Sequence, residues 1–155
     1  MREVLADLQA KLVQNRLTWA RGLQESGRKS FTSLLENPFN TDERCCIGHG
    51  CQIFDLPRKV IYDGRTTKVY YGEGKFRCST APQGFQKLVG LRHDTGFFEG
   101  SPAYQTCLAS LNDIDCWTPQ EIGQWMEEDW LEGGPGTPFL TAAEHHRKWG
   151  GDVGH

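Results

Sequence analysis

The chain has 155 residues and a formal net charge of −3, with 37% hydrophobic and 11% aromatic residues. This length and composition fit one domain with a hydrophobic core, and the lack of internal repeats or low-complexity segments excludes a repeat protein. The first residues include charged side chains and no run of roughly 18 apolar residues occurs, so neither a signal peptide nor a membrane span is expected.

The first half of the chain predicts one long helix and one β-hairpin. Apolar residues recur at roughly helical spacing over residues 3–26, and Gly27 supplies a stop signal. Residues 59–72 alternate apolar and polar side chains on either side of Asp63-Gly64. This dipeptide favours a tight hairpin turn because glycine accepts a positive φ without steric cost.

Helical signals return in the second half. Residues 81–89 predict a short helix, and residues 107–111 predict a further helical turn. The strongest start signal is Thr118, followed by proline and then by Glu121, an arrangement typical of a capping box at a helix N-terminus. An amphipathic helix is therefore predicted near residues 117–131.

The predicted elements indicate an α+β fold in which helices pack on a small antiparallel sheet that contains the hairpin. Residues 1–132 are expected to form one globular domain. Residues 133–155 are expected to form a linker, at 132–140, and a C-terminal tail with a short helix at 141–149.

Charge is distributed unevenly along the chain. Residues 1–55 have no net charge, residues 56–92 carry eight basic and two acidic side chains, and residues 93–155 carry two basic and eleven acidic ones. The basic middle segment can pair with the acidic end inside the fold, or it can leave a basic face open for an anion or an acidic partner.

Six cysteines occur, and the densest cluster lies at residues 45–51. Without a secretory signal, thiols in a reducing cytoplasm are expected, so these residues are interpreted as buried thiols. Two alternatives stay open. Cys46, His49 and Cys51 are candidate zinc ligands, although no Cys-x-x-Cys pair is present. Cys46 or Cys51, with His49 or His93 as the base, is a candidate catalytic pair.

The predicted hairpin region interleaves basic and aromatic side chains, which is typical of surfaces that bind phosphates, bases or acidic proteins. An ordinary half-exposed hairpin has the same alternation. Neither a Gly-x-Gly-x-x-Gly motif nor a Walker-type loop is present, which disfavours a conventional nucleotide fold. The candidate ligand-binding residues are Arg58, Arg65, Lys68, Tyr71, Lys75 and Arg77.

Three blocks of sequence resemble an uncharacterised family of small bacteriophage (including cyanophage) and bacterial proteins. They are the block at 44–51, which contains Cys-Cys-x-Gly-x-x-Cys, the block at 81–91, and a block at 108–113 that ends in Leu-Asn-Asp and precedes the helix beginning near Thr118. The resemblance implies a protein of the bacterial or host-cell cytoplasm and carries no activity with it. His49-Gly50 departs from the family pattern, which makes a loop or a site more plausible at this point.

The leading hypothesis is a non-catalytic binding protein that takes an anionic small molecule, such as a nucleotide-like signal, or a host protein. An anti-defence role follows from the resemblance alone. The alternatives are a Cys/His-dependent hydrolase or transferase and a small structural zinc protein. Single-stranded nucleic acid as a partner and a homo-oligomeric state both stay open, whereas a membrane partner is not expected.

Overall fold

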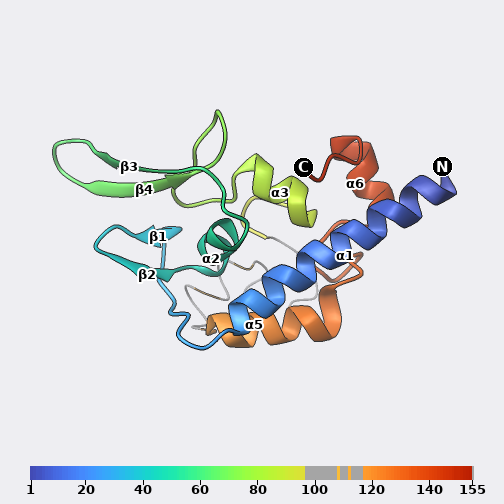
Figure 1. Cartoon of the computed structure of the whole chain (residues 1–155), viewed down its shortest axis with the longest axis horizontal. Coiled ribbons are helices and arrows are strands. Elements are labelled where there is room, and N and C mark those ends of the chain that lie inside the picture. The colour runs from blue at the N-terminus through green and yellow to red at the C-terminus, as the bar shows by residue number, and fades with distance from the viewer. Residues whose placement is uncertain (97–107, 109–111, 113–116, 155) are drawn as a thin grey trace.

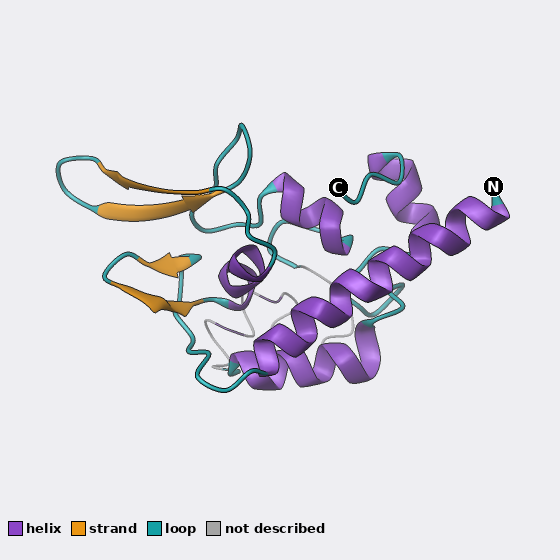
Figure 2. Ribbon diagram, in the orientation of Figure 1, coloured by secondary structure: helices purple, strands orange, loops and turns teal. Residues whose placement is uncertain are grey.

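Helices and two separate antiparallel hairpins build the fold of this computed structural model (Figure 2), which describes residues 1–96, 108, 112 and 117–154. The α+β prediction is confirmed. The elements in chain order are α1 (Arg2–Gln24), β1 (Glu36–Asn37), β2 (Asn40–Arg44), α2 (Cys46–Ile53), β3 (Arg58–Tyr62), β4 (Thr67–Tyr71), α3 (Gln83–Val89), α5 (Pro119–Trp125), the π-helical η1 (Met126–Trp130) and α6 (Ala142–Trp149).

The long N-terminal helix is confirmed, and it organises the other helices. α1 crosses the molecule with α5 and η1 alongside it, and it also contacts α2, α3 and α6 (Figure 1). Leu12, Trp19 and Leu23 are fully buried on one side of this helix. That periodic apolar stripe explains why the segment is helical: the helix buries its apolar face against several neighbours.

The core is centred on Trp19. Its indole lies edge-on to Phe85, with ring centroids 4.8 Å apart, and contacts Phe139 at 6.0 Å. The indole N–H donates to the carbonyl oxygen of Cys46 at 3.1 Å, so the buried polar atom is satisfied. One side chain of α1 therefore joins α2, α3 and the segment before α6.

The predicted hairpin is confirmed as β3–β4, with Arg58 opposite Tyr71 and Tyr62 opposite Thr67. Asp63 begins the turn, and its carboxylate accepts the backbone N–H groups of Arg65 and Thr66, each at 2.9 Å. The structure adds a second hairpin, β1–β2, that was not predicted. Figure 1 shows the two hairpins stacked at one end of the molecule, opposite α6.

The two helices α5 and α6 each begin with a capping box. Glu121 donates its backbone N–H to the Thr118 hydroxyl, and its carboxylate accepts the Thr118 N–H, both at 3.1 Å. Thr141 and Glu144 make the same pair of bonds at the start of α6. The helices predicted near 117–131 and 141–149 are confirmed. The helical turn predicted at 107–111 lies outside the described residues, apart from Leu108.

The cysteine-rich segment corrects one prediction. His49-Gly50 was expected to form a loop or a site. Both residues instead lie inside α2 and are buried, so the loop is ruled out. The glycines allow close packing: a Cβ at Gly48 would lie 1.7 Å from the carbonyl oxygen of Leu35, and one at Gly50 would lie 2.5 Å from Phe85. Glycine is required at these positions because neighbouring parts of the chain lie against the backbone of α2.

The expected linker at 132–140 is a second correction, because this segment packs into the core. Phe139 is fully buried in the main cluster. Leu140 donates its N–H to the carbonyl of Gly90 at 2.8 Å, and the guanidinium of Arg16 donates to the carbonyls of Leu131 and Leu140. Arg16 is itself fully buried, and burial lowers its pKa to about 9.

Candidate functional site

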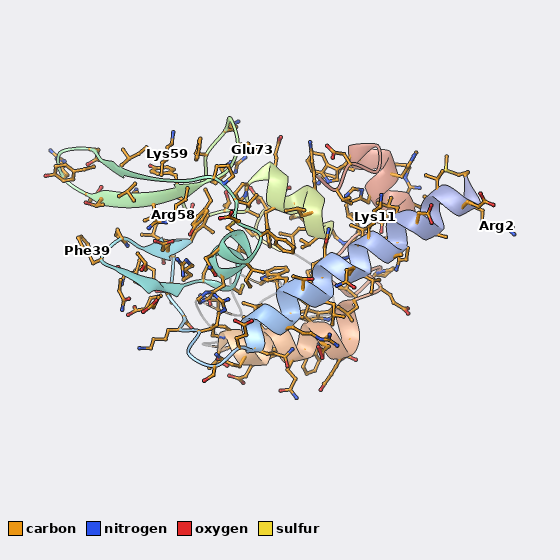
Figure 3. The ribbon with its side chains drawn as sticks, in the orientation of Figure 1. Arg2, Lys11, Phe39, Arg58, Lys59 and Glu73 are labelled. Carbon is orange, nitrogen blue, oxygen red and sulfur yellow. The ribbon has the colours of Figure 1, made fainter. Side chains whose placement is uncertain are left out.

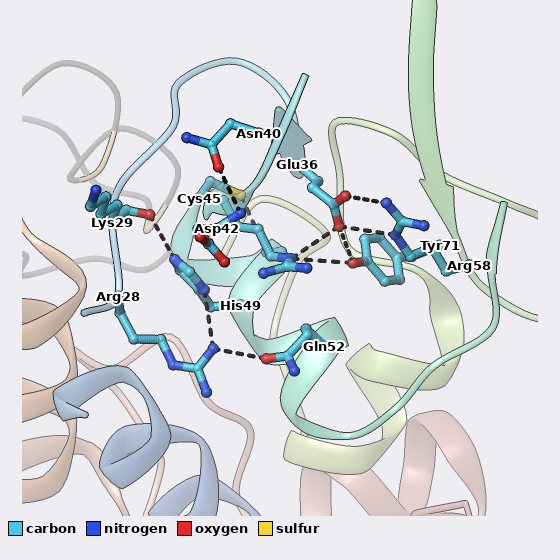
Figure 4. Close-up of polar contacts among 12 residues, drawn as sticks. Arg28, Lys29, Glu36, Asn40, Asp42, Cys45, His49, Gln52, Arg58 and Tyr71 are labelled. Carbon is cyan, nitrogen blue, oxygen red and sulfur yellow. Dashed lines mark hydrogen bonds and ion pairs between the residues drawn. The ribbon is translucent and has the colours of Figure 1, made fainter. Parts of the chain in front are cut away.

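A buried carboxylate joins the two hairpins. Glu36 of β1 is fully buried, and its Oε1 accepts Arg44 Nε at 3.0 Å and Arg58 Nε at 3.1 Å (Figure 4). A second bond from Arg58 and one from the Tyr71 hydroxyl complete its shell. Because β1 and β2 supply one side and β3 and β4 the other, Glu36 fixes the relative position of both hairpins.

The charges in this cluster hold Glu36 ionised. Burial alone would raise its pKa, but the hydrogen bonds from Arg58 and Tyr71 and the charges of Arg44 and Arg58 outweigh it, so its pKa lies below the usual value. Burial and the bond to Glu36 raise the pKa of Tyr71 to about 12. Neither group exchanges a proton near neutral pH, which fits a supporting role.

His49 lies beside this cluster, in α2. Its Nε2 is 2.7 Å from the carbonyl oxygen of Lys29, and its Nδ1 is 3.5 Å from Nη1 of Arg28 (Figure 4). Because a carbonyl accepts, Nε2 carries the hydrogen and Nδ1 is the acceptor. Burial, with the charges of Arg28 and Arg44, lowers the pKa of His49 to about 4. The imidazole is neutral and makes only structural contacts.

The candidate catalytic residues lie in different environments. Cys46 and Cys51 are fully buried, and burial raises the pKa of Cys51 well above its usual value, which works against formation of the reactive thiolate. Cys46 Sγ is directed toward the carbonyl of Leu108, at 3.8 Å. His93 is exposed, and its carbonyl accepts the N–H of Gly96 in a turn.

The zinc alternative receives no geometric support from the described residues, among which no three Cys, His, Asp or Glu side chains form a cluster that could hold a metal ion. Cys46, His49 and Cys51 share α2, but Cys51 lies on a different side of the helix from Cys46 and His49, which are three residues apart. His49 contacts Lys29 and Arg28, whereas Cys46 contacts the carbonyl of Leu108.

An exposed apolar groove lies between the two hairpins. Phe39, at the turn between β1 and β2, is 85% exposed, and Tyr62, at the end of β3, is 67% exposed. The groove has a volume of about 530 Å³, and Arg65 and Lys68 line it together with these two aromatic residues. Figure 3 shows Phe39 projecting from the tip of its hairpin. This surface combines exposed aromatic groups with basic ones.

Of the six predicted ligand-binding residues, three lie at the surface and three make contacts within the protein. Arg65 and Lys68 line the groove, and Lys75 lies exposed in the loop after β4. The other three have internal partners. Arg58 and Tyr71 bind Glu36, while Arg77 donates to Thr80 at 2.9 Å and pairs with Asp94 at 3.4 Å.

A second cavity, of about 540 Å³, lies between the end of α2, α3 and the C-terminal segment. Three carboxylates line it, those of Asp55, Glu73 and Asp152, against the single cation Lys87. Lys87 is already paired with Asp152 at 3.2 Å. The surplus of negative charge makes this cavity unsuitable for the anionic ligand expected from the sequence.

Phe39 and Glu36 are central to the site and were not predicted from the sequence. The Asn37-Pro38 dipeptide is a turn signal, and Asn37 Oδ1 does accept the N–H of Phe39 at 2.9 Å. That signal could have predicted the β1–β2 turn and the exposure of Phe39. Glu36 offered no comparable signal, since its role depends on cations that are distant in sequence.

The chain matches no protein-family model, no curated protein and no solved structure. Among the helices in the described part of the chain, none is long and apolar enough to cross a membrane. Function is therefore inferred from the geometry of the two hairpins and the groove between them.

Proposed function

We propose that this protein acts by non-catalytic binding, and that its ligand is an acidic segment of a partner protein that contacts the groove between the two hairpins. The observation that carries this proposal is the presence of Phe39 and Tyr62, both largely exposed, in one groove with Arg65 and Lys68. Exposed apolar surface bordered by polar groups is typical of protein interaction sites.

The apolar part of the surface would supply affinity. Val60 is 52% exposed on the same face of β3 as Tyr62, and Ile61, which is 40% exposed, adds apolar surface on the opposite face. Each aromatic ring removed from water contributes roughly 1.5–3 kcal/mol when fully buried. Exposure of these side chains to water is unfavourable in the free protein, and burial against a partner would remove that unfavourable free energy.

The basic part would select for an acidic partner. Among the described carboxylates, none forms an ion pair with Arg65 or Lys68. By contrast, Arg44 and Arg58 are occupied by Glu36. The available positive charge lies at the border of an open groove, which suits an extended acidic surface better than a small anion that must be enclosed.

The resemblance to phage proteins favours a host protein as the partner. A phage-encoded chain in the host cytoplasm would meet host proteins, and binding one of them at this groove would block it without catalysis. An anti-defence role is one form of such blocking.

A double charge reversal tests the proposal. In the variant Arg65→Glu with Lys68→Glu, binding of a fluorescent peptide of alternating Glu and Val should weaken about tenfold or more in an anisotropy titration, which corresponds to roughly 1.4 kcal/mol or more. The matched control is Arg2→Glu with Lys11→Glu, which changes the net charge equally at exposed positions far from the groove (Figure 3) and should bind as the wild type does.

Two results would contradict the proposal. One is equally weakened peptide binding in the control pair, which would show that the effect depends on net charge alone. The other is tight binding of a single-stranded oligonucleotide by the wild type with no binding of the acidic peptide, which would assign the aromatic and basic groups to base stacking and phosphate contact.

A further inference from the structure

The outer edge of β3 is open. Within the described part of the chain, β3 pairs with β4 alone, and all five of its residues are exposed. Unpaired N–H and C=O groups in a row form a template for another strand. Native proteins usually cover or interrupt such an edge, whereas this one is a continuous strand from Arg58 to Tyr62.

The register shows which backbone groups are free. Gly72 donates its N–H to the carbonyl of Pro57, and Asp63 donates to the carbonyl of Thr66. Bonded pairs alternate with non-bonded pairs in an antiparallel ladder, so the bonded pairs fall on odd-numbered positions of β3. The N–H and C=O groups of Arg58, Val60 and Tyr62 therefore point to the open edge.

Side chains on the two faces of β3 differ in character. Val60 and Tyr62 lie on the face that carries Val69 and Tyr71, toward β1 and β2, whereas Lys59 and Ile61 lie on the opposite face. Figure 3 shows Arg58 between the hairpins and Lys59 on the other side of the sheet. A strand that alternates apolar and acidic residues would place its apolar side chains beside Val60 and Tyr62. Its carboxylates would lie on the face of Lys59, which Lys68 shares because it is opposite Ile61.

We infer that the acidic partner segment binds by adding a third strand to the β3 edge, with its backbone paired to Val60 and its neighbours. This inference rests on the proposed function and specifies its mode of recognition, in which main-chain bonds supply affinity and alternate side chains supply selectivity. A second copy of this chain is a poorer occupant, because pairing two β3 edges would bring together two basic hairpins.

Substitution at Val60 separates backbone pairing from side-chain contact. Val60→Pro removes an N–H that points outward and leaves every β3–β4 bond intact, since proline is tolerated where a strand N–H faces solvent. Val60→Ala removes most of the side chain and keeps the N–H. We expect Val60→Pro to weaken binding of the Glu-Val peptide about tenfold more than Val60→Ala does.

A peptide experiment with the wild-type protein removes any dependence on how the variant folds. The Glu-Val peptide is prepared in two forms, with backbone N-methyl groups on all Glu or on all Val residues. Each form blocks one edge of the peptide strand, so one form should lose binding and the other should keep it.

Three outcomes would overturn the inference. Equal affinity of Val60→Pro and Val60→Ala, or of the two methylated peptides, would show contact through side chains alone. Those results would leave the proposed function standing if the charge reversal at Arg65 and Lys68 still abolished binding. A wild-type dimer that becomes monomeric in Val60→Pro, measured by sedimentation, would assign the edge to a second copy.

Discussion

At the scale of single residues, buried polar groups around the hairpins have internal partners that fix their protonation. Glu36 is ionised among Arg44, Arg58 and Tyr71, and His49 is neutral between Lys29 and Arg28. A buried charge is tolerated only when it is paired, and removing one partner costs far more than the pair contributes. These residues therefore stabilise the two hairpins that border the groove.

The neutral state of His49 predicts a loss of stability in mild acid. Its pKa is 6.5 in an ordinary setting and about 4 in the folded protein, so between these values the unfolded chain binds a proton that the folded chain does not. The free energy of unfolding therefore falls as pH is lowered through this window, by about 1.4 kcal/mol per pH unit. From pH 7 to pH 5, His49 should account for roughly 2 kcal/mol, measured by urea unfolding.

The variant His49→Gln should lose this part of the pH dependence, because its amide still donates to the Lys29 carbonyl but does not titrate. His145 contributes in the same direction, since burial lowers its pKa as well. An unchanged slope in His49→Gln would show that His49 takes up its proton at the same pH in the folded and the unfolded chain.

At the scale of secondary structure, α2 illustrates how packing overrides propensity. Glycine in a helix interior is unfavourable by roughly 0.5–1 kcal/mol relative to alanine. Yet α2 holds Gly48 and Gly50 within eight residues, because Leu35, Phe85 and Trp19 approach its backbone closely. The same glycines, considered only as local signals, favour a loop, which is why the sequence-based expectation for His49-Gly50 was wrong.

Alanine substitutions should therefore have opposite signs in two helices. Gly48→Ala should lower the free energy of unfolding by at least about 2 kcal/mol, because the new methyl group overlaps the Leu35 carbonyl. Gly84→Ala in α3 is the matched control: its Cβ would meet only Leu56, at 3.7 Å, so propensity should raise stability by roughly 0.5–1 kcal/mol. Denaturant titrations measure both, and a stabilised Gly48→Ala would refute the packing at this helix.

At the scale of the whole molecule, the uneven charge is partly neutralised within the fold. Cations of the basic middle segment pair with carboxylates of the acidic C-terminal part, so the charge distribution serves assembly of the domain as well as binding. Lys75 and the groove residues Arg65 and Lys68 form none of these pairs. The pairs are Arg77 with Asp94, Lys87 with Asp152, and Arg92 with Glu144.

The C-terminal segment is also expected to be necessary for stability. Phe139→Ala should cost about 3–5 kcal/mol, because it empties a position against Trp19 and the cation of Arg16 in the main core. Pro135→Ala, at an exposed position four residues earlier, should change stability by no more than about 0.5 kcal/mol. Equal and negligible effects in guanidinium unfolding would restore the linker interpretation.

The sequence by itself determined the local elements: α1, the β3–β4 hairpin and the capped helices α5 and α6. Helical periodicity, a turn dipeptide and a capping box each act over a few neighbouring residues, so their signals survive without tertiary context. The general region of the candidate site followed from the same local pattern, through Arg65 and Lys68.

Only the tertiary structure decided which basic and aromatic residues are available. Arg58 and Tyr71 are occupied because Glu36 lies 22 and 35 positions away in the chain and is buried beside them. Phe39 enters the site because an unpredicted hairpin places it in the same groove as Tyr62. Burial and ion pairing between distant segments depend on how the whole chain packs, and no local pattern records them.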